Sequence, residues 1–141
     1  MIQRKQTIWL FLVAVIAFIL TNAPLYTGTM AGQVSKSFIT KESLLLFAVT
    51  AITGLLALIA LFLFKNRKLQ LRLATFGIIL SLALVGLEVW QINSFRLENS
   101  TLTGFYAWGA LLPIAMFVFF IMAASGIRKD EKLIKSLDRL R

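Results

Sequence analysis

The sequence predicts an all-α polytopic membrane protein with four transmembrane helices and a short amphipathic C-terminal helix. Of its 141 residues, 59% are hydrophobic and only 15% are charged, whereas soluble domains are roughly half apolar and a quarter charged. The apolar residues form runs of about twenty, the length that crosses a hydrocarbon core of about 30 Å. Because these runs and their short connections use nearly the whole chain, we expect one domain over residues 1–141.

The first span is predicted over residues 7–26. A short basic start precedes an unbroken apolar run at 8–20, which is also the pattern of a signal peptide, with a possible cleavage site at Ala23. Pro24 directly after that site argues against cleavage, so the span is expected to stay in the protein. A polar loop over 27–42 follows, and Thr40 followed by Ser43 offers capping oxygens just ahead of the next apolar run.

The second and third spans, over 43–64 and 69–92, are separated by a basic turn. Four positive charges fall within eight residues, from Lys65 to Arg72, and such a cluster cannot lie in hydrocarbon. The chain must therefore leave the membrane here and turn back. Asn66 is the expected turn residue, because its short polar side chain tolerates a positive φ.

The fourth span is predicted over 104–127, after a second polar loop at 93–103. Pro113 lies inside this span and should kink it, because proline lacks the amide that would bond to the Gly109 carbonyl. The tail over 128–141 changes character. It alternates charges with apolar residues at helical spacing, which predicts an amphipathic helix on the membrane surface or against the bundle. These apolar residues are Leu133, Ile134, Leu137 and Leu140.

The distribution of charge predicts the orientation. With four spans, twelve Lys and Arg residues lie on the side of the termini and the basic turn, and three lie on the other side. The positive-inside rule makes the twelve-charge side cytoplasmic. We therefore expect a bacterial inner-membrane protein with both termini in the cytoplasm. Tyr and Trp residues, which favour interfaces, fall near the ends of these spans.

The residue inventory argues against an enzyme. The chain contains no Cys and no His, which removes thiolate nucleophiles, the commonest transition-metal ligand and the usual general base. Serine and threonine hydroxyls are scattered, with no base to activate them. We expect no catalytic residue, no metal site and no cofactor.

One acidic residue, Glu88, lies inside a predicted span. At helical spacing it shares a face with Ser81 and the small residues Ala74 and Gly77, which favour close helix packing. An acid within a membrane is a candidate for proton or cation transport. The alternative interpretation is structural or interfacial, because Glu88 lies about one turn from the end of the span and no second acid, Lys or His shares the membrane interior.

The remaining candidate site is the basic cytoplasmic face, which would bind anionic lipid headgroups or a partner protein. Positive charge also orients the protein, but the tail carries more charge than orientation requires. Contact with nucleic acid would rest on charge alone and is not the preferred interpretation. The residues of this predicted face are Arg4, Lys5, Lys65, Arg67, Lys68, Arg72, Arg128, Lys129, Lys132, Lys135, Arg139 and Arg141.

Three short strings, spread over both ends and the middle of the chain, resemble a domain-of-unknown-function family of small bacterial membrane proteins with four predicted spans. They are Met1-Ile2-Gln3-Arg4 with Gln6, then Lys65-Asn66-Arg67-Lys68-Leu69-Gln70 with Arg72 and Leu73, and Asp130-Glu131-Lys132-Leu133 with Ser136, Asp138, Arg139 and Arg141. The resemblance supports the fold and the compartment and implies no reaction.

The preferred function is therefore a non-enzymatic accessory or scaffold subunit, whose basic face contacts anionic lipid and a larger membrane complex. The alternative is a small oligomeric transporter or channel that uses Glu88 in the third span.

Overall fold

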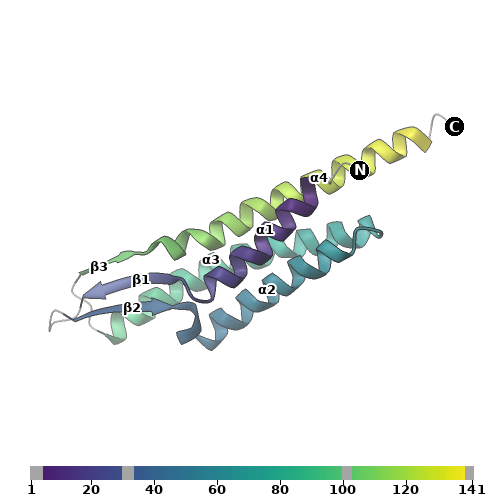
Figure 1. Ribbon diagram of the computed structural model, residues 1–141. Helices are drawn as coiled ribbons and strands as arrows, with labels where there is room; N and C mark the ends of the chain where they lie inside the picture. The colour runs from purple at the N-terminus through teal and green to yellow at the C-terminus, as the bar shows by residue number, and fades with distance from the viewer. Residues whose placement is uncertain (1–4, 30–33, 100–102, 139–141) are drawn as a thin grey trace.

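The computed structural model describes residues 5–29, 34–99 and 103–138, and it contains a bundle of four helices with a small sheet at one end (Figure 1). Helix α1 packs against α2 and α4, and α3 packs against the same two helices. The helices span the following residues: α1 Lys5–Leu20, α2 Leu44–Phe62, α3 Arg67–Glu98 and α4 Leu112–Asp138. Short 3-10 helices at Thr40–Glu42 and Trp108–Leu111 precede α2 and α4.

Three of these helices are long and apolar enough to cross a membrane, in the segments Leu44–Phe62, Arg67–Glu98 and Trp108–Ile134. Helix α1 is shorter: its 16 residues extend over about 24 Å at 1.5 Å per residue. The prediction that the first helix reaches residue 26 is wrong. Pro24 cannot continue the helix, and the chain enters a strand there instead.

An antiparallel three-stranded sheet lies at the end of the bundle where α1 ends and α2 begins (Figure 1). Strand β1, Pro24–Thr29, is the central strand between β2, Ser35–Ile39, and β3, Thr103–Tyr106. Tyr26 of β1 faces Phe38 on one side and Tyr106 on the other. The sequence predicts loops over 27–42 and 93–103, but β2 and part of β1 lie in the first of these segments. It also predicts a membrane span from residue 104, where the chain instead forms β3. These predictions are wrong.

Aromatic side chains fix the sheet to the end of α3. The ring of Phe95 lies 5.2 Å from that of Phe38 and 6.4 Å from that of Tyr26, centroid to centroid. Tyr26 also packs edge-on against Tyr106 at 5.7 Å. Tyr26 is 2% exposed, so it belongs to the packed core of the sheet, whereas the sequence predicts it at a lipid interface.

The connections into α2 and α3 use side-chain caps. Ser43 accepts a hydrogen bond from the Leu46 amide at 3.3 Å, as the capping prediction requires, while the Thr40 hydroxyl instead donates to the Leu20 carbonyl. Asn66 has φ −109° and caps α3 by accepting from the Leu69 amide at 3.3 Å. The prediction of a left-handed turn residue is therefore wrong, because Asn66 serves as an N-cap, a position that asparagine equally favours.

Helix α3 continues six residues beyond its predicted end at residue 92. Its buried face repeats at intervals of three and four residues, and Ile92 and Phe95 continue that repeat past the apolar segment. Polar residues such as Ser94 and Glu98 occupy the other faces of these turns. The last turns of α3 are thus an amphipathic helix on which the sheet rests.

Helix α4 differs from its prediction at both ends. It begins at Leu112, so Pro113 lies in its first turn, where proline has no helical hydrogen bond to lose. The predicted kink at Pro113 is therefore wrong. At the other end, α4 runs without interruption to Asp138, and the described part of the tail is an extension of α4 and not a separate short helix (Figure 1).

The core lies along the bundle axis and is made of residues that repeat at helical spacing. In α1 the buried series is Gln6, Leu10, Val13, Ala17 and Leu20. Large apolar side chains also cover much of the outer surface; Leu44 is 82% exposed and Phe62 is 72% exposed. An apolar outer surface of this extent is unusual for a soluble monomer.

Candidate functional site: the basic end of the bundle

The end of the bundle opposite the sheet, here called the basic end, contains the predicted basic residues that the structure describes. The turn between α2 and α3, the start of α1 and the extension of α4 all lie there (Figure 1). In the turn and first part of α3, Lys65, Lys68 and Arg72 are exposed, and Arg67 is half-buried. Arg67 Nη1 donates to the main-chain carbonyl of Asp130 at 3.4 Å, so this part of α3 is in direct contact with α4.

The extension of α4 adds basic residues on its exposed surface. Arg128, Lys129 and Lys132 are exposed. Lys5 and Lys135 lie within α1 and α4 respectively. The other predicted residues of the face, Arg4, Arg139 and Arg141, lie outside the described residues.

Two buried glutamines lie beneath this basic surface. Gln70 is fully buried, and its Nε2 donates to the Ala60 carbonyl at 3.0 Å, which links α3 to α2. Gln6 is 3% exposed and packs on Gly126, where an added Cβ would lie 3.2 Å from the Gln6 Cβ. Neither Oε1 atom has a hydrogen-bond partner among the described residues. Sequence reasoning did not select these side chains as site residues, although Gln6 begins the buried repeat of α1.

Glu88 and Ser81 lie on the buried face of α3, as predicted, but the structure does not join them. They are seven residues apart, about 10 Å along the helix. The Ser81 hydroxyl donates within its own helix to the Ile78 carbonyl at 2.9 Å. Glu88 is 4% exposed, and its Oε1 has no partner among the described residues. Among the buried side chains that the structure describes, Glu88 is the only one from an Asp, Glu, Lys or Arg residue.

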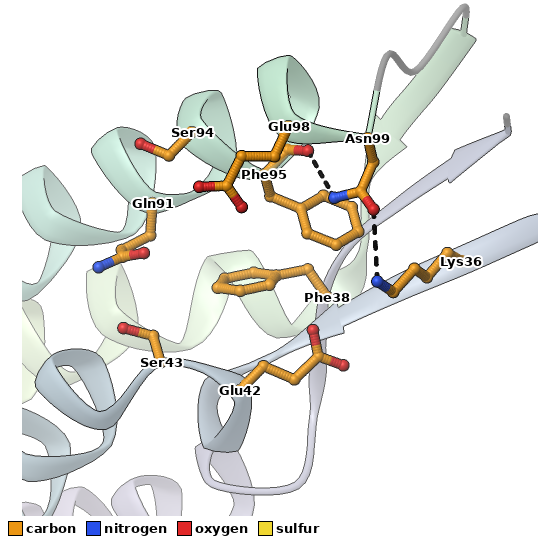
Figure 2. Close-up of a pocket in the computed structure, with 9 residues that line it drawn as sticks. All are labelled: Lys36, Phe38, Glu42, Ser43, Gln91, Ser94, Phe95, Glu98 and Asn99. Atoms are coloured by element: carbon orange, nitrogen blue, oxygen red, sulfur yellow. Dashed lines mark hydrogen bonds between the residues drawn. The ribbon is translucent and has the colours of Figure 1, made fainter.

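A second group of polar side chains surrounds a cavity of about 390 Å³ at the sheet end (Figure 2). It lies between β2, the residues just before α2 and the last turns of α3. Sequence reasoning missed it because the lining residues were divided between two polar loops, 27–42 and 93–103, and the adjoining ends of two spans. No sequence pattern indicated that these segments lie together. The residues that line it are Lys36, Phe38, Glu42, Ser43, Gln91, Ser94, Phe95, Glu98 and Asn99.

Residues 2–140 match the model of a family described as Domain of unknown function (DUF4293). The chain belongs to this family. The match covers the three strings on which the resemblance rests, apart from Met1 and Arg141 at their outer ends, and it carries no activity with it. No curated protein and no solved structure is significantly similar to the chain.

In the DUF4293 chain, the structure brings residues of the three strings together at the basic end. Gln6 comes from the first string, Arg67 and Gln70 from the second, and Asp130 from the third. Gln6 lies against Gly126 of α4, and Arg67 bonds to Asp130 of the same helix. Residues from all three strings thus belong to one packed region of the protein.

Proposed function

We propose that this protein is an integral protein of a bacterial inner membrane, with its basic end in the cytoplasm, and that it acts there as a non-enzymatic accessory subunit that binds anionic lipid headgroups. The observation that carries the proposal is the shared position of the basic turn and the α4 extension at one end of an otherwise apolar bundle. Three helices are long and apolar enough to cross a bilayer. The charge asymmetry supports the orientation.

Lipid binding follows from the exposure and chemistry of the basic end. Six of its basic side chains are exposed in the turn before α3, on the first turns of α3 and on α4, where they can reach phosphate oxygens beside the bundle. Each basic residue near an anionic membrane surface contributes about 1 kcal/mol. These exposed residues are Lys65, Lys68, Arg72, Arg128, Lys129 and Lys132.

The extension of α4 supports a role in a larger complex. Beyond the other helices it presents Leu133, 63% exposed, and Ile134, 40% exposed, among its charges. A helix with exposed apolar and basic residues can lie on lipid or pack on a partner helix.

The geometry favours this role over transport through Glu88. A relay needs a further polar station within reach, and the Ser81 hydroxyl is committed to the Ile78 carbonyl about 10 Å away along the helix. No second Asp, Glu, Lys or Arg side chain is buried in the described parts of the chain.

The test uses the full-length protein in nanodiscs that contain phosphatidylglycerol and phosphatidylcholine, with the lipids retained on the protein counted by native mass spectrometry. The variant R128Q/K129Q/K132Q removes three positive charges from the basic end. It should lose up to about 3 kcal/mol of anionic-lipid binding and retain markedly less phosphatidylglycerol.

The control is K41Q/R96Q, which removes two positive charges from the opposite end and leaves Lys36 of the cavity unchanged; it is compared with the double variant K129Q/K132Q at the basic end. K41Q/R96Q should retain phosphatidylglycerol at the wild-type level. Equal retention by these two double variants would refute lipid binding at the basic end.

The accessory role has its own test. A photo-crosslinking amino acid at Leu133 should form an adduct with another membrane protein in native membranes, while the same probe at exposed Val34, outside the basic end, should not. A protein that yields only lipid adducts from Leu133 would contradict a partner at the α4 extension.

A further inference from the structure

The cavity at the sheet end has the size of a small-molecule site. Its volume is about 390 Å³, within the range of roughly 300–1,000 Å³ typical of ligand pockets and many times the approximately 30 Å³ of one water molecule. Its walls come from three segments distant in sequence: β2, the residues before α2, and the end of α3. The fold therefore builds this space, and no single loop creates it.

Two carboxylates face the cavity from different walls. Glu42 comes from the 3-10 helix before α2, and Glu98 comes from the last turn of α3; both side chains are exposed and line this open cavity from different sides (Figure 2). Neither makes a hydrogen bond or ion pair with another residue that the structure describes. Two acceptors on opposite walls suit a ligand with several donors, such as an ammonium group.

The single lysine of the lining is directed away from these carboxylates. Lys36 Nζ donates to Asn99 Oδ1 at 3.3 Å and lies 5.3 Å from the centroid of the Phe95 ring. It therefore neutralises neither Glu42 nor Glu98 by direct pairing, and the lining keeps one negative charge in excess. The contact also shows that the Phe95 ring accepts a cation in this cavity.

The rest of the lining suits an organic cation better than a metal ion. Within residues 5–29, 34–99 and 103–138, no three carboxylate or other metal-binding side chains come close enough to hold a metal. The floor consists of two buried aromatic rings, Phe38 and Phe95, which pack at 5.2 Å. Ser43, Ser94 and Gln91 add uncharged hydrogen-bonding groups around them.

The position of the cavity adds a link to the membrane. Ser43 directly precedes the apolar helix α2, whose first residue, Leu44, is 82% exposed, and Trp90 of α3 is 60% exposed one residue before the lining begins at Gln91. The cavity thus lies at the boundary between the apolar helices and the polar sheet, where lipid headgroups lie beside the bundle in the proposed orientation.

We infer that this cavity is a binding site for an ammonium group, carried either by an ethanolamine lipid headgroup or by a free small amine. The ammonium sits between Glu42 and Glu98 above the two phenylalanine rings. In the lipid case, the headgroup phosphate can lie beside Lys36. This site is at the opposite end of the bundle from the basic face and does not depend on it.

The experiment places the full-length protein in two kinds of nanodisc, one of phosphatidylglycerol alone and one of phosphatidylglycerol with phosphatidylethanolamine. Native mass spectrometry measures the retained lipids, and circular dichroism follows thermal unfolding with and without added ethanolamine. Retained phosphatidylethanolamine identifies the lipid headgroup as the ligand. A higher unfolding temperature with ethanolamine in the phosphatidylglycerol discs identifies a free amine.

The variant E42Q/E98Q should weaken either form of binding by about tenfold or more, because it converts charge-assisted hydrogen bonds into neutral ones. The control D130N/E131Q removes two negative charges at the other end and should bind like the wild type. A third variant, S94F, keeps every charge but fills the cavity, and it should block binding as well.

Unfolding curves of the variants without ligand show whether each one folds. Absence of both phosphatidylethanolamine retention and an ethanolamine effect in the wild type would overturn the inference. So would wild-type binding by both E42Q/E98Q and S94F, since the ligand would then bind elsewhere on the protein.

Discussion

A methyl group added at Gly77 should force apart the contact between α3 and α4. A Cβ built at this position would overlap the ring of Phe120, a side chain that is fully buried in the bundle. Because the ring is enclosed on all sides, it cannot turn away without displacing its neighbours. Gly86, on the same helix, provides the matched control, since a Cβ there would meet no atom within 4 Å.

The two substitutions should therefore change the free energy of unfolding in opposite directions. Replacing glycine by alanine within a helix stabilises it by about 0.5–1 kcal/mol, and G86A should gain this amount. In G77A the same gain is opposed by overpacking, which costs about 1–3 kcal/mol. The expected gap between the two variants is about 1–3 kcal/mol, with G77A the less stable.

The measurement is unfolding of the full-length protein by sodium dodecyl sulfate in detergent micelles, followed by circular dichroism. A double variant, G77A/F120L, should recover part of the lost stability, because the smaller side chain makes room for the methyl group. Equal stability of G77A and G86A would show that α3 and α4 do not meet at Phe120 as the structure has them.

Two further predictions test the sheet end and the start of α4. F95A should release the sheet, because Phe95 joins it to α3 through Phe38 and Tyr26. Truncating a buried phenylalanine costs about 3–5 kcal/mol. Hydrogen exchange should therefore become much faster at the amides of β1 and change little at those of α2. A uniform change across the chain would contradict this. P113A should alter stability by less than about 1 kcal/mol in the same detergent titration, since proline in a first turn replaces no helical hydrogen bond; a loss of several kcal/mol would point instead to a role in the helix interior.

The helices and the basic turn could be predicted because their signals are local. Long apolar runs identify α2 and most of α3 and α4, and the charges from Lys65 to Arg72 locate the turn between them. Helix ends were less accurate. The last turns of α3 are polar on average, and only the spacing of Ile92 and Phe95 along the buried face shows that the helix continues.

The sheet could not be predicted, because its strands are short and their pairing partners lie far apart in the sequence. Its strands have four to six residues, and Tyr26 pairs with Tyr106, eighty positions later in the chain. Adjacent Leu25 and Tyr26 are both buried, so β1 lacks the alternation that identifies a strand. The cavity was missed for the same reason, because Lys36, Glu42 and Glu98 meet only after the sheet has formed.

The basic site was predicted in part. Charge counting placed the turn and the tail on one side, and the structure has them at one end of the bundle. The contact between Arg67 and the Asp130 carbonyl forms where α4 continues as a helix past residue 127, whereas the sequence predicts a separate tail helix there. The burial of Gln6 and Gln70 depends on the neighbouring helices, and no composition signal reveals it.

The short first helix and the sheet have a common physical explanation in the proposed membrane orientation. Helix α1 covers about 24 Å, less than the roughly 30 Å of a hydrocarbon core. At the basic end its residue Gln6 lies beside Gly126, well before α4 ends at Asp138, and its other end lies toward the sheet. There the chain continues as β1. Non-helical backbone is tolerated near hydrocarbon only where other parts of the protein form hydrogen bonds with its N–H and C=O groups. Strand β1 meets this condition because it is paired with β2 on one edge and β3 on the other. In the proposed orientation, the sheet therefore allows α1, which is shorter than the hydrocarbon core, to keep its packing against α2 and α4.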